Sequence, residues 1–367
     1  MSSDHPGVRL AATVTTAASL SFVPVAIHFN LFATLVRIAK AATVDEIVKA
    51  SDESRSEEAK KSAPLCLQLA KDTLFAMAGL RFVDMPSEDV YLANDITKYM
   101  ILTVPSAQDG ALHFTTEALF AGAFLMRKLV DTKFEYPFKE RDTPMQYAYK
   151  MMGNEKLANE HTYSIMHLEG RMDSFNKFME GKFVKIPEMP KRVKGLGYDL
   201  DAAIKGNENP VAMVDIGGGR GELLLQVKEA YPHLEDSNLV LQEFNAEIGS
   251  VPGVTVMDWN FKDDSPQPIQ GAMIYSLAHI FHNLPDLDAL ALLQKLANAM
   301  APHSRLLVHE FTKNLTYSYI EATMMLLYGG RIRSSREWSR LAALSGLGVT
   351  FEAYPPVGEG LIELRKI

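Results

Sequence analysis

The C-terminal half of the chain alternates short apolar runs with longer amphipathic segments. The apolar runs predict strands at residues 211–216, 239–242, 254–257, 272–277, 305–310, 349–353 and 361–364. Apolar residues at helical spacing predict helices at residues 222–231, 287–300, 317–327 and 337–345. Strands that alternate with helices form a doubly wound α/β sheet, which binds ligands at the carboxyl ends of its strands. We therefore predict one α/β domain over residues 191–367.

The first 40 residues contain a long stretch with almost no charge. Between Leu10 and Val36 the one ionisable side chain is His28, a pattern that also suits a membrane span or a signal peptide. Threonines and serines, together with Pro24 and Asn30, interrupt the apolar run and favour two buried helices joined near Pro24. Helices that are apolar on most faces usually pack against another subunit or a large core. We therefore predict that this region forms a homodimer interface.

The next segment predicts two helices. Thr43 and Glu46 have the spacing of a capping box at a helix start. The polar residues 51–61 predict a solvated linker. A second helix is expected over residues 64–77, with Gly79 as its left-handed cap.

A small hairpin is expected after these helices. Residues 81–84 and 90–92 predict its two strands, which completes a winged-helix pattern over residues 1–105. The second helix carries Lys71 as its internal cation, and Asp72 opposes it at once. We therefore predict a winged-helix dimerisation domain with no DNA-binding role.

Residues 106–190 predict mostly helices that are rich in methionine and aromatic side chains. Most of these side chains are expected in a core. Their density also suits an adaptable apolar pocket, because thioethers fill irregular space. We therefore predict a helical connector that walls a pocket for a hydrophobic small-molecule substrate.

The composition limits the kind of partner. The 367 residues carry a formal net charge of −8 and a single cysteine, Cys66. One cysteine excludes an internal disulfide framework and a cysteine-rich zinc module, so a reducing compartment such as the cytoplasm is expected, with Cys66 buried. The sequence lacks the long basic run that nucleic-acid binding favours. Small molecules or other proteins are therefore the expected partners.

The strongest functional motif is Val-Asp-Ile-Gly-Gly-Gly-Arg-Gly at residues 214–221. It places Asp215 at the end of a strand, and its spaced glycines let the backbone approach a ligand before a helix begins. Glu243 ends the next strand, where a carboxylate can accept both ribose hydroxyls, and residues 258–261 offer groups suited to an adenine ring. A dinucleotide needs a loop that accepts pyrophosphate, whereas Asp215 favours an ammonium group. S-adenosylmethionine (SAM) carries that group, and a nicotinamide-dependent oxidoreductase is the less favoured alternative.

The chain resembles the class I SAM-dependent small-molecule O-methyltransferases, especially the fungal type. The resemblance rests on the glycine loop, the order of the domains and the closing motif Tyr-Gly-Gly-Arg-x-Arg-Ser followed by Glu-Trp, at residues 328–338. It implies a homodimer of class I methyltransferase fold, with His282 as general base and Glu310 orienting that histidine. The implied cofactor-binding residues are Asp215, Gly217, Gly219, Glu243, Phe244, Asp258, Asn260 and Phe261.

The predicted reaction centre departs from the family pattern. The family has arginine or lysine, three residues, and then His-Asp-Trp, whereas this sequence has Ala278, His282, Asn283 and Leu284. Ile332 stands where the family has a second acid. The sequence therefore leaves one supporting carboxylate where methyl transfer normally uses more.

Three functions are compatible with this pattern. In the first, His282 and Glu310 deprotonate a substrate hydroxyl for ordinary methyl transfer. In the second, to which we lean, the chain resembles SAM-dependent pericyclases of fungal alkaloid and polyketide pathways. There, bound SAM acts as a cation that lowers the barrier of a dehydration, cycloaddition or rearrangement. The third function, a noncatalytic dimeric scaffold, is the least favoured.

His113 favours the pericyclase function, because a neutral imidazole can polarise a carbonyl of a polyketide or pyridone-type substrate. His279 lies three residues before His282, but no third ligand with suitable spacing follows. We therefore expect no metal site.

Overall fold

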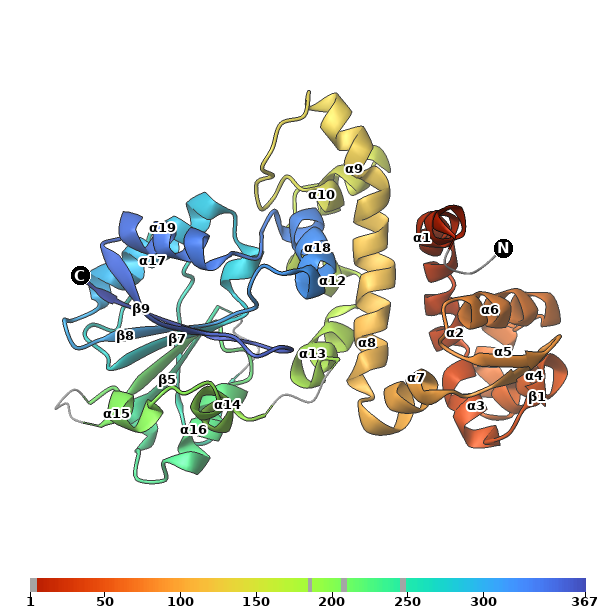
Figure 1. The fold of residues 1–367 in the computed structure, drawn as a ribbon, viewed down its shortest axis with the longest axis horizontal. Helices are drawn as coiled ribbons and strands as arrows, with labels where there is room; N and C mark the ends of the chain where they lie inside the picture. Colours follow the sequence, from red (N-terminus) through yellow and green to blue (C-terminus); the bar gives the residue numbers. More distant parts are fainter. Residues whose placement is uncertain (1–4, 184–186, 206–209, 245–248) are drawn as a thin grey trace. The chain divides into compact units, whose positions relative to one another are not determined.

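The computed structural model of the chain describes residues 5–183, 187–205, 210–244 and 249–367. The chain divides into two units (Figure 1). The N-terminal unit contains residues 1–128 and 144–185, and the C-terminal unit contains residues 129–143 and 186–367.

The C-terminal unit is built on a seven-stranded sheet with the strand order β6-β5-β4-β7-β8-β10-β9. Its strands are β4 (Met213–Ile216), β5 (Leu239–Glu243), β6 (Thr255–Asp258), β7 (Ile274–Ala278), β8 (Arg305–His309), β9 (Leu347–Ala353) and β10 (Leu361–Lys366). Neighbouring strands are parallel except β10, which is antiparallel to β8 and β9. All seven predicted strands are present within two residues of their expected bounds. The mixed sheet has a class I methyltransferase-like topology, which confirms the predicted fold class.

Helices cover both faces of this sheet (Figure 1). One face packs against α17 (Asp286–Ala299) and α19 (Ser335–Leu344), and the other against α14 (Met189–Gly195), α15 (Leu200–Ile204) and α16 (Glu222–Ala230). Adjacent residues of β4 enter different cores, since Met213 packs with the α14 group and Val214 with the α17 group. The central strands are therefore apolar on both faces, and the polar groups collect at their carboxyl ends. The unit also contains α18 (Ser318–Tyr328) and the short helices η3 (Asp236–Asn238), η5 (Phe281–Asn283) and η6 (Leu315–Tyr317).

A short segment from the predicted connector, residues 129–143, belongs to the C-terminal unit. The hydroxyl of Tyr136 donates to the sulfur of Met325 at 2.7 Å. The backbone oxygen of Phe138 lies 2.8 Å from where a side chain on Gly329 would begin, and Gly329 has a φ of +67°. The first glycine of the closing motif therefore allows this close backbone approach.

The N-terminal unit is mostly helical and contains a three-stranded sheet of order β1-β3-β2. Its first part comprises α1 (Pro6–Leu20), α2 (Val23–His28), α3 (Leu31–Ile38), β1 (Ala42–Thr43), α4 (Val44–Glu53), α5 (Glu57–Ser62), α6 (Leu67–Gly79), β2 (Asp84–Ser87), β3 (Val90–Leu92) and α7 (Asp95–Lys98). Its second part comprises η1 (Tyr99–Thr103), α8 (Ser106–His113), η2 (Phe114–Ala118), α9 (Leu119–Asp131) up to Lys128, α10 (Pro144–Met151), α11 (Glu155–Ala158), α12 (Thr162–Leu168) and α13 (Met172–Gly181). The predicted capping box of Thr43 and Glu46 is confirmed at the start of α4.

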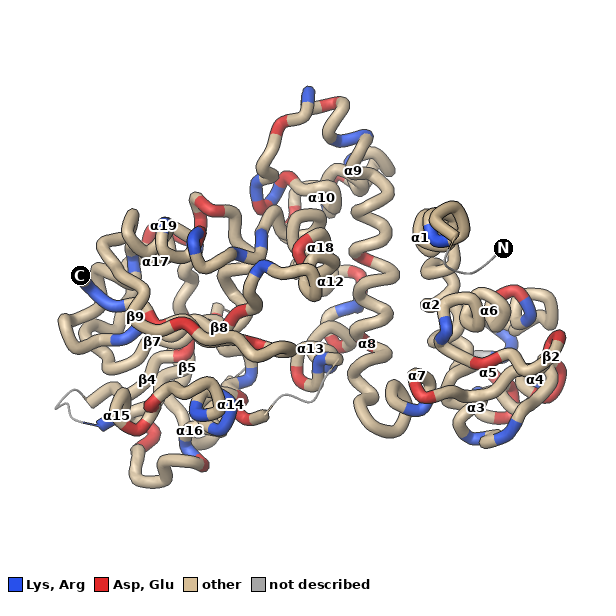
Figure 2. Tube along the Cα trace, viewed as in Figure 1, with Lys and Arg blue, Asp and Glu red and all other residues tan. Residues whose placement is uncertain are grey.

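The prediction of two buried helices near the N-terminus is wrong. The segment forms three helices, because the chain breaks after Leu20 and again at Phe29–Asn30. Pro24 is instead the second residue of α2, where a missing N–H costs nothing. No described residue of α1 is buried, and its one Lys, Arg, Asp or Glu is Arg9, so the helix is almost entirely uncharged in Figure 2.

Three further local predictions fail in this unit. Most of α5 lies within the predicted linker, and its acidic first turn and basic last turn suit the helix dipole. The first hairpin strand is Asp84–Ser87 and not residues 81–84. Arg81 (φ 62°), and not Gly79, takes the left-handed conformation after α6. The C-cap residue of α6 is Leu80, which has a right-handed conformation. The left-handed residue therefore comes at Arg81, two residues after Gly79.

Cys66 is exposed, so its predicted burial is wrong. Its sulfur accepts the backbone N–H of Leu69 at 3.4 Å at the start of α6, and an N-cap position faces solvent. Among the described residues, no helix has the length and apolar character needed to cross a membrane.

Candidate cofactor edge and reaction centre

The glycine loop follows β4 directly and leads into α16. Gly217, Gly219 and Gly221 have φ values of +66°, +59° and +81°, which side-chain-bearing residues rarely adopt. A side chain on Gly217 would begin 2.7 Å from the end of Ile280. The backbone N–H of Gly217 donates to the carbonyl of Gln242 at 2.7 Å, which ties the loop to β5. The loop therefore needs glycine for both its conformation and its close packing.

Asp215 is buried in β4 just before this loop. Burial is the main cause that raises the pKa of its carboxyl to about 7, and the nearby Glu243 and Glu222 act in the same direction. Its Oδ1 has no hydrogen-bond partner within the described structure. A buried acceptor without a partner beside a glycine loop fits the ammonium group of SAM, because pairing would satisfy the oxygen and restore its charge.

Glu243 and Asp258 lie side by side at the carboxyl ends of the paired strands β5 and β6. Glu243 accepts the backbone N–H of Gly219 at 3.0 Å and that of Phe244 at 2.9 Å. These bonds hold the predicted ribose acceptor against the glycine loop. The Phe244 side chain is mostly exposed.

Residues 258–261, which were predicted to face an adenine ring, divide between the core and the neighbourhood of the glycine loop. Trp259 belongs to the core beneath β5 and β7, and its indole N–H donates to Ser265 at 3.0 Å. Asn260 accepts the backbone N–H of Lys262 at 3.1 Å, which shapes the turn. Phe261 lies 3.8 Å from where a side chain on Gly217 would begin. Phe261, and not Trp259, is therefore the aromatic ring next to the loop.

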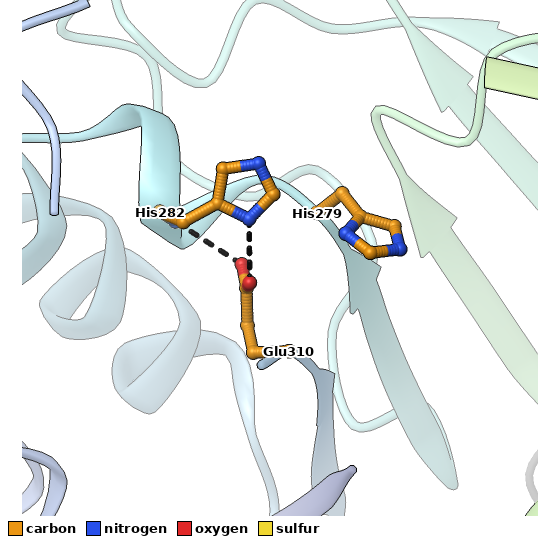
Figure 3. A group of neighbouring side chains, drawn as sticks. All are labelled: His279, His282 and Glu310. Carbon is orange, nitrogen blue, oxygen red and sulfur yellow. Dashed lines mark hydrogen bonds and ion pairs between the residues drawn. The ribbon is translucent and has the colours of Figure 1, made fainter. Parts of the chain in front are cut away.

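The predicted reaction centre lies at the ends of β7 and β8, where the structure brings His282 and Glu310 together (Figure 3). His282 Nδ1 and Glu310 Oε2 are 2.6 Å apart, and Glu310 Oε1 accepts the backbone N–H of His282 at 3.1 Å. Burial alone would raise the pKa of Glu310, but its electrostatic attraction to the His282 and His279 rings and the bonds from His282 outweigh it and lower that pKa. Glu310 is therefore a carboxylate that fixes the orientation of the His282 ring.

Residues of the closing motif hold His282 in place. The buried Arg333 donates to the carbonyls of Phe281 at 2.6 Å and Leu284 at 2.8 Å, and it pairs with Asp286 at 2.8 Å. A side chain on Gly330 would begin 2.1 Å from the backbone oxygen of His282. The motif therefore works as a backbone clamp, a role that the sequence alone did not indicate.

The positions that depart from the family pattern serve packing. Leu284 and Ile332 are buried, and Ile332 lines a small depression together with His282 and Phe311. Asn283 donates to the backbone oxygen of His279 at 3.2 Å.

A second histidine–carboxylate pair adjoins the first and was missed by the sequence analysis. His279 Nε2 lies 2.5 Å from Glu359 Oε1, and the ring centroids of His279 and His282 are 5.3 Å apart. Glu359 also pairs with Arg192 at 3.2 Å. The site therefore contains two buried carboxylates, whereas the sequence predicted one, that of Glu310. Glu359 lies just before β10 and 80 residues after His279, so the spacing of residues along the chain could not indicate that the two side chains meet.

The distances at this cluster are those of hydrogen bonds. His279, His282 and Glu310 offer ligand-type atoms within 4.8 Å of one another. However, Nδ1 of His282 and Oε2 of Glu310 are 2.6 Å apart, whereas two atoms bound to one metal ion at about 2.1 Å are about 3 Å apart. The contact between His282 and Glu310 is therefore a hydrogen bond.

His113 belongs to the N-terminal unit, at the junction of α8 and the π-helical segment η2. It is buried with its ring 5.1 Å from that of Phe175 and 5.4 Å from that of Phe114. Its Nδ1 lies 3.2 Å from Glu117, which also accepts from Arg171 at 2.9 Å. Burial raises the pKa of Glu117, but the bonds and charges of these partners outweigh it and lower that pKa. The Glu117 carboxylate is therefore shared between His113 and Arg171.

Comparison with known proteins gives the family. An O-methyltransferase domain model matches residues 204–348. The O-methyltransferase bfoE of Aspergillus brasiliensis is 55% identical over 364 residues, which is 98% of this chain and 96% of that protein. The chain belongs to the O-methyltransferase family. This family uses SAM as its methyl donor, so both the recognised family and the expected cofactor are confirmed.

Two solved structures support the fold of this O-methyltransferase family member. A protein described as a pericyclic reaction enzyme aligns with a TM-score of 0.79 at 20% identity, over 99% of this chain and 90% of that one. LepI in complex with SAM aligns with the same TM-score, identity and coverage.

Proposed function

We propose that the chain transfers the methyl group of SAM to a hydroxyl oxygen of a hydrophobic small molecule, with His282 as general base. The observation that carries this proposal is the buried pair of His282 and Glu310, in which both carboxylate oxygens contact the histidine. The relative that is 55% identical and named an O-methyltransferase also supports it. This is the function that the sequence analysis treated as the alternative.

The proton transfer follows from the tautomer. Glu310 accepts the Nδ1–H of His282, so the lone pair of a neutral ring lies on Nε2. Nε2 accepts the proton of the substrate hydroxyl, and Glu310 stabilises the resulting imidazolium. SAM supplies, when bound, a methyl group made electrophilic by the adjoining sulfonium.

The cofactor-binding residues in this proposal are those predicted from the sequence. Asp215 would pair with the ammonium group, the loop at Gly217 and Gly219 would allow close backbone approach, and Glu243 would accept the ribose hydroxyls. The remaining contacts to the nucleoside would come from Phe244, Asp258, Asn260 and Phe261. The orphaned Oδ1 of Asp215 supports this assignment.

A SAM-dependent pericyclic reaction is the second candidate. It is favoured by the replacement of the family's charged and indole groups by Ala278, Asn283 and Leu284. In that reaction His282 would act as a hydrogen-bonding group, and His113 would be a second polar anchor for a polyketide or pyridone-type substrate of fungal secondary metabolism.

Product analysis separates the two candidates. The purified protein is incubated with SAM and candidate hydroxylated polyketides, and the products are examined by mass spectrometry together with S-adenosylhomocysteine. Methyl transfer yields one S-adenosylhomocysteine for each product that is heavier by a methyl group. Substrate conversion without S-adenosylhomocysteine would overturn the methyl-transfer proposal and support the pericyclase.

We also propose a homodimer built on residues 10–40. The exposed apolar residues Leu10 and Val14 of the nearly uncharged helix α1 support this proposal, because such a surface is a liability in a monomer. Light scattering should give twice the chain mass of 40.7 kDa. A mass near 40.7 kDa at all concentrations would contradict the dimer.

A further inference from the structure

A pair of buried glutamines adjoins the predicted nucleoside side of the cofactor site. Gln242 belongs to β5 and Gln267 to the loop between β6 and β7, and the two residues are 0% and 1% exposed. Gln242 Nε2 donates to Gln267 Oε1 at 2.6 Å, and Gln267 Nε2 donates to Gln242 Oε1 at 2.8 Å. Each side-chain amide therefore both donates to the other and accepts from it.

The loop holds Gln267 in a restricted conformation. Pro266 and Pro268 flank this residue. Proline fixes its own φ, and a residue that precedes proline is mostly confined to extended backbone. Gln267 Oε1 also accepts the backbone N–H of Ile269 at 3.0 Å, and the Gln267 carbonyl accepts from the side chain of Gln270 at 2.6 Å. The loop therefore presents the Gln267 amide to β5 in a fixed position.

Gln242 is linked to all three parts of the predicted cofactor site. Its carbonyl accepts the backbone N–H of Gly217 in the glycine loop at 2.7 Å. The next residue of β5 is Glu243, the proposed ribose acceptor. Gln242 Nε2 also lies 3.6 Å from the sulfur of Met257, which precedes Asp258 in β6. A displacement of Gln242 would therefore move these three parts relative to one another.

The choice of two amides for this place is informative. Apolar side chains of the same length would fill the space without the cost of removing polar groups from water. The net contribution of such hydrogen bonds to stability is modest, because the same groups bond to water in the unfolded chain. Hydrogen bonds are directional, however, so an amide pair fixes the separation and angle of two segments more narrowly than apolar packing does.

We propose that the Gln242–Gln267 pair fixes Glu243 relative to residues 258–261, so that one nucleoside meets both. The two glutamines are too deeply buried to contact the ligand, so they are positioning residues that act through Glu243. This inference rests on the proposed cofactor contacts and extends them to the residues that align those contacts.

Adenosine and 2′,3′-dideoxyadenosine test the proposal, because they differ only in the two ribose hydroxyls. Their affinities are measured by competition with SAM. The wild type should favour adenosine by about tenfold or more, since the dideoxy ligand cannot donate to the Glu243 carboxylate. In Gln267→Met this preference should decrease by about threefold or more. A purely structural defect weakens both ligands equally, so an unchanged preference would overturn the proposal.

The double variant Gln242→Met/Gln267→Met separates position from stability. It leaves no amide buried without a partner, so its unfolding temperature should lie closer to that of the wild type than the temperature of Gln267→Met does. The preference for adenosine should nevertheless stay low, because flexible thioether side chains do not fix the two segments. Recovery of the preference together with stability would assign the pair a structural role alone.

Two further variants complete the test. Glu243→Gln should also reduce the preference for adenosine, and an unchanged preference in this variant would refute the proposed ribose contact itself. A preference that falls in Glu243→Gln but not in Gln267→Met would refute the positioning role alone. The exposed Gln294→Met of α17 is the matched control and should bind both ligands as the wild type does.

Discussion

Each unit contains a buried histidine–glutamate pair, and the two glutamates differ in their other partners. Glu310 directs both oxygens to His282, at the ring and at the backbone N–H. Glu117 faces His113 at 3.2 Å with one oxygen and accepts from Arg171 at 2.9 Å with the other. One carboxylate therefore serves a single histidine, and the other is shared with a permanent cation.

This difference separates the roles of the two histidines. A carboxylate that is already paired with arginine does less to stabilise an imidazolium. His282 is thus suited to gain a proton during the reaction. His113, enclosed by Phe114 and Phe175, is suited to an uncharged contact.

The largest effect is expected from His282→Gln. Glutamine fills a similar space but cannot take up a proton, so methyl transfer should fall by about 100-fold or more. SAM affinity, measured by calorimetry, should not change, because His282 lies outside the glycine loop. The exposed His303→Gln is the matched control and should retain full activity. Retention of more than a tenth of the wild-type rate would assign the base to another group.

Glu310→Gln should have the next largest effect. Glutamine can still accept the backbone N–H of His282, but it lacks the charge that stabilises the imidazolium. A hydrogen bond to a charged group contributes about 1.5–3 kcal/mol, which corresponds to a loss of about 10- to 100-fold in kcat/KM. The acidic limb of the pH profile should also move to lower pH, because the variant removes a negative charge beside His282. The exposed Glu229→Gln is the control, and a loss below threefold would refute the assigned role.

The candidate cofactor edge, formed by the glycine loop and the carboxyl ends of β4, β5 and β6, could be predicted from the sequence because its parts lie close together along the chain. Asp215, Gly217 and Gly219 lie in one motif, and Glu243 ends the next predicted strand. Each strand is a short apolar run between glycines or polar residues, so the sheet was predicted within two residues. Trp259 was misplaced, since an aromatic residue after a strand can face the core or the ligand equally well.

The histidine cluster could be predicted only in part. Its residues come from α14, the ends of β7 and β8, and the loop before β10. Glu359 reaches His279 because β10 returns antiparallel beside β8, a pairing that spacing along the chain does not encode. The helix boundaries of residues 6–38 failed for a different reason, because proline is compatible with a helix start as well as with a break.

The affinity of the cofactor edge for SAM should depend on pH, and this effect should be smaller than the rate losses expected for His282→Gln and Glu310→Gln. With the pKa of Asp215 raised to about 7, the group is mostly neutral at pH 6 and charged at pH 8. If the charged form binds the ammonium group, SAM affinity rises about tenfold between these pH values. 5′-Methylthioadenosine lacks that group, so its affinity should stay constant over the same range. An equal pH dependence for both ligands would refute the pairing.

The same group affects stability in the free protein. The pKa of Asp215 is higher in the folded state than the ordinary value of 3.8, so folding favours its neutral form. This contribution to stability is present below about pH 4 and is lost as the pH rises through about 7. Asp215→Asn should remove this dependence, which thermal unfolding between pH 5 and pH 8 would detect.

The smallest effect is expected from His113→Asn if methyl transfer is the reaction. Asparagine keeps a polar group on α8, and the carboxylate of Glu117 remains paired with Arg171, so kcat/KM should fall by less than about tenfold. The acidic limb of the pH profile should not move, because His113 does not exchange a proton in the reaction. A pericyclase that uses His113 to polarise a carbonyl gives the opposite result, since the loss of one placed donor slows such a reaction by about 100-fold or more. Parallel measurements on His113→Asn and His282→Gln therefore distinguish one base and one packed histidine from two cooperating donors.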